Sequence, residues 1–329
     1  MIFLKCFSFK IKKPVIISVL CVVIALSIIL CSVLPTDIDD YYEVSTTAQE
    51  KKFIKWVDFS VSYEALKQAI DYDISSQQTD IKLDFISLLA IAACKNGGKF
   101  DDKKSKVIDD TVTRIQNGET VESITSNMEY YSYYYQAYSA VLSGFLGQTD
   151  NGYGLKVYSP IASGFSYSHS DDFGNGRSYG FKRKHLGNDL MGSVGTPIVA
   201  VEDGIIETMG WNRYGGWRIG IRSYDSKRYY YYAHLRRGHP YVNTLKEGME
   251  VKAGDVIGYL GMTGYSDTED YNGMQVPHLH FGMQLIFDES QKDSNTEIWI
   301  DVYNIVRLLQ NTRSKVRKNE ETNEWERIT

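Results

Sequence analysis

The segment VPHLHFG, residues 276–282, constrains this chain more than any other. In a β-strand, residues two apart point to the same face, so His278 and His280 would share one face while Leu279 and Phe281 pack on the other. Two adjacent imidazoles are costly to bury unless something binds them, and neutral imidazole is the side chain that most often binds divalent metals. The segment therefore predicts either two surface histidines or part of a metal site.

A second motif supplies the other ligands that a metal site would need. His185 and Asp189 are four residues apart, and Gly187 and Gly192 argue against a helix, so we expect an extended or looped segment. With one histidine of the later pair they give two nitrogens and one carboxylate. This is the ligand set of a catalytic zinc site, in which a fourth position is left for water. Among the abundant metals, zinc fits a mixed set of nitrogen and oxygen ligands without thiolate best, although cobalt or manganese could substitute.

A further histidine, His234, lies in the segment YYAHL, which has the composition of a strand. In a strand His234 would share a face with Tyr232 and Tyr230. Four of the six histidines would then belong to one site. We interpret the two that remain as surface residues: His169 and His239.

The N-terminal region predicts a membrane anchor. Residues 15–35 are uncharged and almost wholly apolar, which is long enough to cross the hydrocarbon core of a bilayer. Four lysines precede this run, within a short cytoplasmic stub of residues 1–14, and three aspartates follow it closely. Because the positive flank stays in the cytoplasm, the rest of the chain is expected on the outer side of the cell membrane. A cleaved signal peptide is the alternative, but no small-x-small site follows the run.

Composition narrows the function classes. The net charge of −5 gives no indication of nucleic-acid binding. Only one of the four cysteines, Cys94, lies beyond the apolar run, so the outer part cannot form an internal disulfide or a cysteine-based zinc site. Its domains must be stabilised by their cores, and its metal ligands must come from His, Asp and Glu.

The outer part changes character once along the sequence. After a polar linker, residues 36–55, apolar residues recur at helical spacing through residues 56–147, which predicts a small all-helical domain. Helices are expected over residues 62–70, 84–94, 104–116 and 121–146.

From residue 148, glycines become frequent and short β-rich runs alternate with turns, which predicts a β-rich domain over residues 148–310. Strands are expected over residues 197–209, 217–223, 228–235, 249–260 and 277–287, and a closing helix over 301–310. Residues 311–329 are predicted to form a loose charged tail. The fold class is therefore α+β, preceded by a transmembrane helix.

Taken in order, the histidine motifs resemble a known family. The combination His-x-x-x-Asp, Tyr-x-x-His-Leu and His-Leu-His-Phe is similar to the lysostaphin-type, or LytM-like, zinc endopeptidases, over about residues 155–290. The resemblance implies a compact β fold with one zinc ion in a groove. It also implies a role for each residue: His185, Asp189 and His280 as zinc ligands, and His278 and His234 as the unligated catalytic pair.

The resulting hypothesis is a membrane-anchored zinc metalloendopeptidase that hydrolyses peptide cross-links of bacterial peptidoglycan, the substrate class of the family. The alternative is a non-enzymatic scaffold or binding protein of a cell-envelope or sporulation complex. A glycan-cleaving helical domain is a third possibility, but no acid in residues 56–147 has a distinguishing motif. Five loop residues are expected either to hold an extended peptide or to serve as turn and core residues: Tyr214, Gly215, Gly216, Trp217 and Tyr265.

Overall fold

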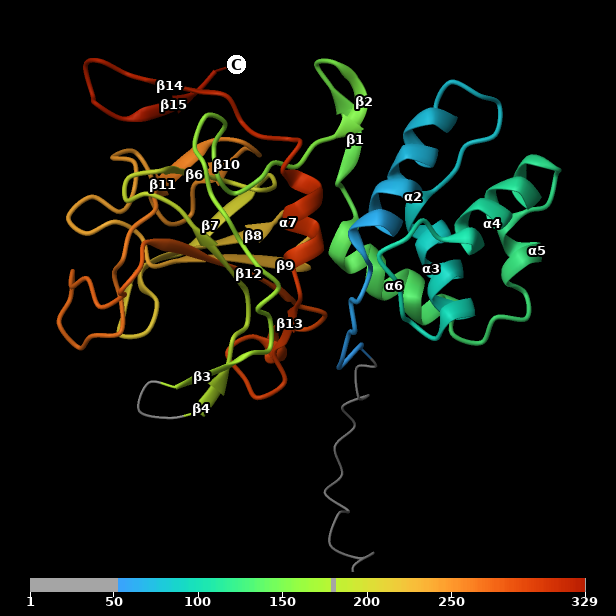
Figure 1. The fold of residues 1–329 in the computed structure, drawn as a ribbon, viewed down its shortest axis with the longest axis horizontal. Coiled ribbons are helices and arrows are strands. Elements are labelled where there is room, and N and C mark those ends of the chain that lie inside the picture. Colours follow the sequence, from blue (N-terminus) through green and yellow to red (C-terminus); the bar gives the residue numbers. More distant parts are fainter. Residues whose placement is uncertain (1–52, 179–181, 329) are drawn as a thin grey trace, which may run out of the picture. The chain divides into compact units, whose positions relative to one another are not determined.

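A computed structural model of the chain describes residues 53–178 and 182–328 (Figure 1). The predicted stub, the predicted transmembrane helix and most of the linker lie outside these residues. Among the described helices, none is long and apolar enough to cross a membrane. Residues Phe53–Thr329 belong to one structural unit.

Helices dominate the first part of this unit, as the apolar spacing predicts. They are α2 (Tyr63–Ser76), α3 (Phe85–Asn96), α4 (Lys106–Gln116), α5 (Val121–Thr125) and α6 (Tyr131–Leu142). Local chemistry sets their ends: the Ser62 hydroxyl accepts a hydrogen bond from the first turn of α2, and the Asp84 carboxylate caps α3. Gly97 ends α3 in the left-handed conformation, at φ 63°. The single helix expected over residues 121–146 is two helices.

The β-rich part is organised around a seven-stranded sheet with the order β10-β7-β8-β9-β12-β13, in which β5 also pairs with β12. Its strands are β5 (Asn188–Met191), β7 (Gly204–Asn212), β8 (Gly216–Ser223), β9 (Arg228–Ala233), β10 (Glu250–Val251), β12 (His278–Leu285) and β13 (Ile298–Ile300). Each pairing is antiparallel. Because β12 has β9 on one edge and β5 and β13 on the other, it is the strand at which distant segments meet.

Smaller pairs surround this sheet. They are β1 (Leu146–Thr149) with β2 (Gly152–Leu155), β3 (Gly176–Ser178) with β4 (Lys182–Lys184), and β6 (Pro197–Val199) with β11 (Val256–Tyr259). The 3-10 turn η2 (Glu289–Gln291) and helix α7 (Tyr303–Leu309) follow β12 and β13. Two strands expected to be continuous are each divided, into β6 and β7 and into β10 and β11. The reason is turn formation between the strands of each pair. The Asp203 carboxylate, in the turn before β7, accepts a hydrogen bond from the Ala253 N–H, in the turn before β11.

The prediction of a loose tail is wrong. Its residues form a hairpin of β14 (Val316–Lys318) and β15 (Trp325–Arg327). The ring of Trp325 packs edge-on against Phe165, with 5.1 Å between centroids. Arg313 and Arg327 donate to backbone carbonyls of the β-rich part, so charges that suggested solvation serve instead as hydrogen-bond donors to the fold.

The helices and the sheet share one hydrophobic core, and a buried polar group joins them. The Arg228 guanidinium, only 2% exposed, donates to the Glu202 carboxylate at 2.8 and 2.9 Å and to the Ala140 carbonyl of α6 at 2.8 Å. The Tyr230 hydroxyl donates to the same carboxylate at 2.6 Å. The change in sequence character at residue 148 therefore does not separate two independent cores, and the domain boundary there stays a prediction.

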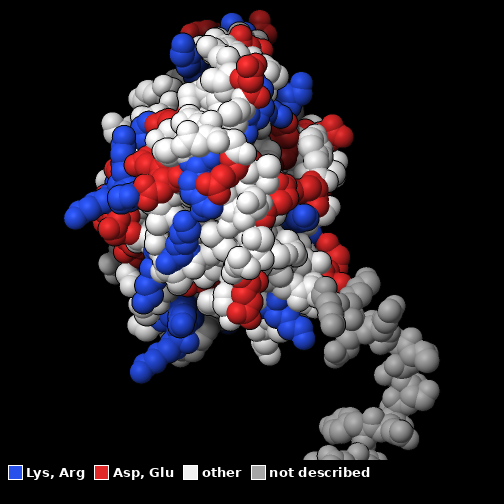
Figure 2. All heavy atoms as spheres, turned by 90° about the vertical axis from the view of Figure 1, so that its right-hand side faces the viewer, with Lys and Arg blue, Asp and Glu red and all other residues white. Residues whose placement is uncertain are grey.

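Figure 2 shows the face of this unit that lies at the right of Figure 1. Basic and acidic side chains are intermixed there, with uncharged areas between them. Several pair along one helix, such as Lys106 with Asp110 and Lys67 with Asp71. Such exposed pairs contribute little to stability, so we expect the buried Arg228 group to matter far more.

Glu202→Ala tests this expectation. The substitution leaves the buried Arg228 guanidinium without its main counter-charge, and we expect the free energy of unfolding to fall by about 3–5 kcal/mol. Urea denaturation followed by circular dichroism measures the change. Asp71→Ala, which removes an exposed pair, is the control and should cost less than about 1 kcal/mol. Equal losses in the two variants would show that the buried pair does not stabilise the fold.

Candidate metal centre

Strand β12 places its two histidines as the alternation predicts. Leu279 and Phe281 are fully buried in the core, and His278 and His280 face the opposite side. Strand register then brings the partners of His280 to it. His280 lies opposite Asp189 on β5 and opposite Ala233, the last residue of β9, on the other edge. Sheet pairing therefore joins three segments that are far apart in the sequence.

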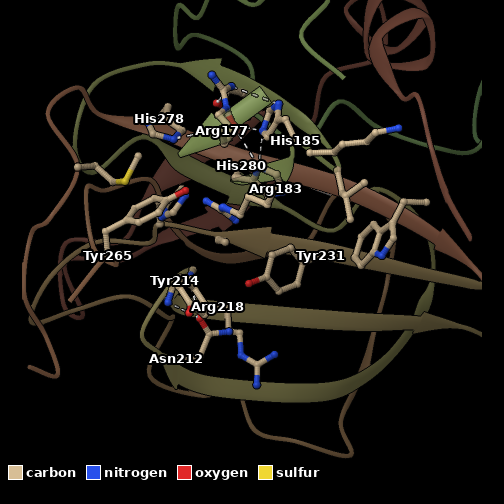
Figure 3. A pocket seen from close by; sticks show the side chains of 18 of the residues that line it. Arg177, Arg183, His185, Asn212, Tyr214, Arg218, Tyr231, Tyr265, His278 and His280 are labelled. Carbon is tan, nitrogen blue, oxygen red and sulfur yellow. Dashed lines mark hydrogen bonds and ion pairs between the residues drawn. The ribbon is translucent and has the colours of Figure 1, made fainter. Parts of the chain in front are cut away.

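Three predicted ligands converge on one point, and Figure 3 shows two of them, His185 and His280. The His185 Nε2 atom lies 2.9 Å from Asp189 Oδ1 and 2.8 Å from His280 Nδ1, and the last two atoms are 3.1 Å apart. In the described part of the chain, this is the one group of three such side chains with ligand atoms within 4.8 Å of one another. Three lone-pair atoms this close repel unless a proton or a cation lies among them. Two nitrogens and one carboxylate oxygen fit a zinc ion with an open fourth position.

A shell of side chains that the sequence did not indicate orients His185. Its Nδ1 atom faces the Asp172 carbonyl at 3.1 Å and the Asp172 carboxylate at 3.2 Å. A carbonyl only accepts, so Nδ1 carries the proton and Nε2 presents its lone pair to the metal position. Arg177 donates to the Asp172 and Asp189 carboxylates, at 2.8 Å each. Neither Asp172 nor Arg177 lies in a motif, so only the folded chain reveals them.

The protonation of each group in this cluster depends on the charges of its neighbours. Burial disfavours a charged His185 ring, but hydrogen bonds to Asp172 and Asp189 outweigh burial and raise the pKa of His185 to about 9. Burial likewise opposes ionisation of Asp189, yet hydrogen bonds from His185 and His280 hold the pKa of that carboxyl well below its usual range. Without a metal, the cluster therefore retains a proton at neutral pH. A bound cation would take the place of that proton.

The other two histidines form a pair beside the cluster. The Nδ1 atoms of His278 and His234 each lie 2.8 Å from a backbone carbonyl, so each Nδ1 carries the proton and each Nε2 is free to accept one. The two rings are 4.8 Å apart, and His278 Nε2 is 3.9 Å from Asp189 Oδ1. Burial and the neighbouring histidines lower the pKa of His234 well below its ordinary value, which keeps that ring uncharged.

The expected orientation of His234 is wrong in one respect. Tyr230 and Tyr232 point into the core, whereas His234 lines the groove together with Tyr231 and Ala233. The strand ends at Ala233, and His234 adopts φ 61°, a left-handed conformation that interrupts the alternation. Such a conformation is unfavourable for a residue with a side chain, typically by 1–3 kcal/mol, and such strain clusters at functional sites.

The histidines lie in a groove of about 880 Å³. Of the five loop residues considered above, three line it: Tyr214, Gly215 and Tyr265. The other two are structural. A Cβ on Gly216 would lie 2.4 Å from the backbone of Thr263, and the Trp217 indole donates to Asp270. The floor of the groove is formed by β12, β9 and β8, so rigid strands hold the reactive side chains.

The remaining histidines are half-buried rather than simply on the surface. His169 Nδ1 lies 2.7 Å from the amide oxygen of Asn188, whose Nδ2 in turn donates to the Asp172 carboxylate at 2.9 Å. His239 stacks on the ring of Tyr259 with 5.2 Å between centroids. His169 thus supports the shell around the metal cluster, and His239 packs elsewhere.

Comparisons with known proteins agree with this geometry. Residues 183–294 match Peptidase family M23. The catalytic domain of lysostaphin from Staphylococcus simulans is 31% identical to this chain, over 43% of this chain and 92% of that one, with a TM-score of 0.33. The chain belongs to peptidase family M23. Its membership rests on the β-rich part, which contains all five predicted site residues.

Two further similarities extend this assignment. The L-Ala–D-Glu endopeptidase of Bacillus subtilis is 39% identical over 38% of this chain and 36% of its own length. The M23 chain described here thus spans about a third of that relative. A crystal structure from Ruminococcus gnavus, assigned as a glycyl-glycine endopeptidase LytM, is 28% identical over 80% of this chain and 93% of its own, with a TM-score of 0.53. That coverage is larger than the β-rich part alone, so the similarity in fold includes helical elements.

Asp172→Ala tests the shell around His185. The substitution keeps the backbone carbonyl that faces His185 Nδ1 but removes the carboxylate that holds both this nitrogen and Arg177, so the ring is less firmly oriented and zinc affinity should fall about 10–100-fold. Competition with a chromophoric chelator measures the affinity. Asp171→Ala, at the neighbouring exposed acid, is the control and should bind zinc like the unaltered chain. An unchanged affinity in Asp172→Ala would contradict the orienting role.

Proposed function

We propose that this M23 protein is a zinc metalloendopeptidase that hydrolyses peptide cross-links of bacterial peptidoglycan. The observation that carries the proposal is the convergence of two nitrogens and one carboxylate beside two further histidines in a groove. Named relatives support the substrate class, since they include an L-Ala–D-Glu endopeptidase, the glycyl-glycine endopeptidase ALE-1 of Staphylococcus capitis and the peptidoglycan DD-endopeptidase ShyC of Vibrio cholerae. These enzymes are named for different bonds, so the relatives support a peptide of the wall rather than one particular linkage.

The proposed chemistry divides between the two groups of side chains. A zinc ion on His185, Asp189 and His280 would polarise the scissile carbonyl and lower the pKa of a bound water. His278 presents an unprotonated Nε2 next to the cluster, where it can take the proton of the attacking water. His234, whose ring centroid is 4.8 Å from that of His278, is held by the Thr263 carbonyl. To donate to the developing oxyanion its Nε2 would first take up a proton, against the burial that lowers the pKa of this ring. Arg177 and Asp172 keep the ligands aligned.

The site variants separate metal binding from proton transfer. His278→Ala should keep zinc but lose about 10²–10⁴ in the rate of wall hydrolysis, because it removes a general base. His280→Ala should lose both zinc and activity, since His185 alone would remain as a nitrogen ligand. Zinc content by mass spectrometry and release of soluble wall fragments give the two readouts. An empty site in His278→Ala with a full one in His280→Ala would reverse the roles.

The same pair of variants tests the scaffold alternative. A scaffold would not depend on either histidine for hydrolysis and would release no wall fragments in its unaltered form. Activity of the unaltered chain that disappears in both variants would exclude this alternative.

We further propose that residues 15–35 anchor the protein in the cell membrane with the M23 part outside, where its substrate lies. The lysines before the apolar run support this orientation. A protease added to cells from which the wall has been removed should digest the M23 part while the membrane stays intact. Protection of the M23 part until detergent is added would contradict the orientation.

A further inference from the structure

Residues that line the groove carry buried hydrogen-bond donors for which the protein supplies no acceptor. Among the described residues, four buried side-chain nitrogen or oxygen atoms have no hydrogen-bond partner, and three of them belong to residues that line the groove: Arg183 Nε, Arg218 Nε and Gln284 Nε2. All three are donors, and Gln284 is only 2% exposed. Leaving such a group unsatisfied costs about 1–3 kcal/mol, so three in one groove indicate a ligand with acceptors.

Charge points to the kind of acceptor. Within the part of the chain that the structure describes, no carboxylate lies within 4.0 Å of the guanidinium nitrogens of Arg183 or Arg218. Arg177 differs, because Asp172 and Asp189 already accept from it. The guanidinium of Arg183 lies 5.0 Å from the centroid of the Tyr265 ring. An aromatic face holds a cation in place without neutralising it, so Arg183 is positioned yet lacks a counter-charge.

These donors flank the metal cluster along the groove. Figure 3 shows Arg183 next to His280 and directed toward Tyr265, and Arg218 beyond the Tyr231 ring. The Tyr231 ring lies between the two arginines in this view, with its centroid 5.9 Å from that of His280 and 6.1 Å from that of Trp299. A peptide lying over Tyr231 would pass Arg183 beside the cluster and Arg218 further along.

Besides Asp189 of the metal cluster, the groove contains two acids that do not cancel these charges. Glu297 accepts a hydrogen bond from the Trp299 indole at 2.8 Å. Asp293 lines the groove as well, but neither acid forms an ion pair with Arg183 or Arg218 among the described residues. Neither of these two acids pairs with the arginines, and two of the three unsatisfied donors belong to cationic side chains.

We propose that this groove selects a peptide with a carboxylate close to the cleaved bond, bound by Arg183, while Arg218 and Gln284 meet acceptors further along the peptide. Hydrogen bonds between a guanidinium and a carboxylate are charge-assisted and often bidentate. A neutral oligoglycine bridge has backbone acceptors but no charge, and it would leave both arginines without a counter-ion. Cleavage of such a peptide rests on the proposed peptidase function, whereas its selective binding does not.

The test compares synthetic cross-linked wall peptides that differ at one group. The first has a free glutamate carboxylate and a free C-terminus, the second has the glutamate carboxylate as an amide, and the third has an amidated C-terminus. Pentaglycine is the neutral reference. Because a hydrogen bond to a charged group contributes about 1.5–3 kcal/mol, the zinc-loaded full chain should show a kcat/KM about 10–100-fold lower for the peptide that lacks the recognised carboxylate. Whether the second or the third peptide loses efficiency identifies which carboxylate is bound.

Variants then assign the preference to the groove. Arg183→Gln should lower kcat/KM for the acidic peptide by the same factor, mainly through KM, and leave the matching amide nearly unchanged. Arg218→Gln should act in the same direction with a smaller effect. Lys182→Gln, which removes an exposed cation on the same strand outside the groove, should change neither peptide. Arg183→Lys should restore part of the preference because it restores the charge.

Binding measurements separate this inference from the peptidase proposal. Titration calorimetry on the His278→Ala chain should show tighter binding of the acidic peptide than of its amide, and Arg183→Gln in that background should remove the difference. If no peptide is cut but this selectivity holds, the groove inference stands and the peptidase function is wrong. If the amides and pentaglycine bind and are cut as well as the acidic peptide, or if the preference persists in both arginine variants, the inference is overturned.

Discussion

Antiparallel pairing of β5 with β12 is the constraint on which the site depends. It sets Asp189 directly opposite His280, two residues that are 91 positions apart in the sequence. The same strand pairs with β9 on its other edge and so brings His234 to the groove. A slip of one residue in either pairing would turn these side chains toward the core. The pairing also explains Gly187, since a Cβ there would lie 2.6 Å from the Phe281 carbonyl and 2.7 Å from the His280 ring.

This arrangement also sets the tautomers and charges of the histidines in the site. Backbone carbonyls hold the Nδ1–H of His278 and His234, so both rings offer Nε2 to the groove. Asp172 does the same for His185, but with a carboxylate that raises the pKa of the ring. The ligand side of the cluster therefore favours a positive charge at its centre, whereas burial keeps the His234 ring on the catalytic side uncharged. This difference lets neighbouring imidazoles take separate roles in one site.

Much of this arrangement could be predicted from the sequence, and the reasons are physical. Alternation in residues 276–282 predicted the faces of β12, and apolar spacing predicted the helices, because both patterns report on local periodicity. Asp172, Arg177 and Arg183 could not be predicted, since their contacts depend on loop paths and on a short hairpin. His234 was misoriented because one left-handed residue ends the alternation of β9. The tail was misjudged because its arginines bind carbonyls that only the folded chain supplies.

We propose above all that a metal on His185, Asp189 and His280 enables hydrolysis of wall peptides. Mass spectrometry of purified peptidoglycan digested by the full chain tests it most directly, with zinc present and after chelation. We expect fragments that carry a new amino and a new carboxyl terminus within the peptide part, with intact glycan, and their disappearance when zinc is removed. Fragments from glycan cleavage alone, or peptide cleavage that continues without metal, would contradict the claim.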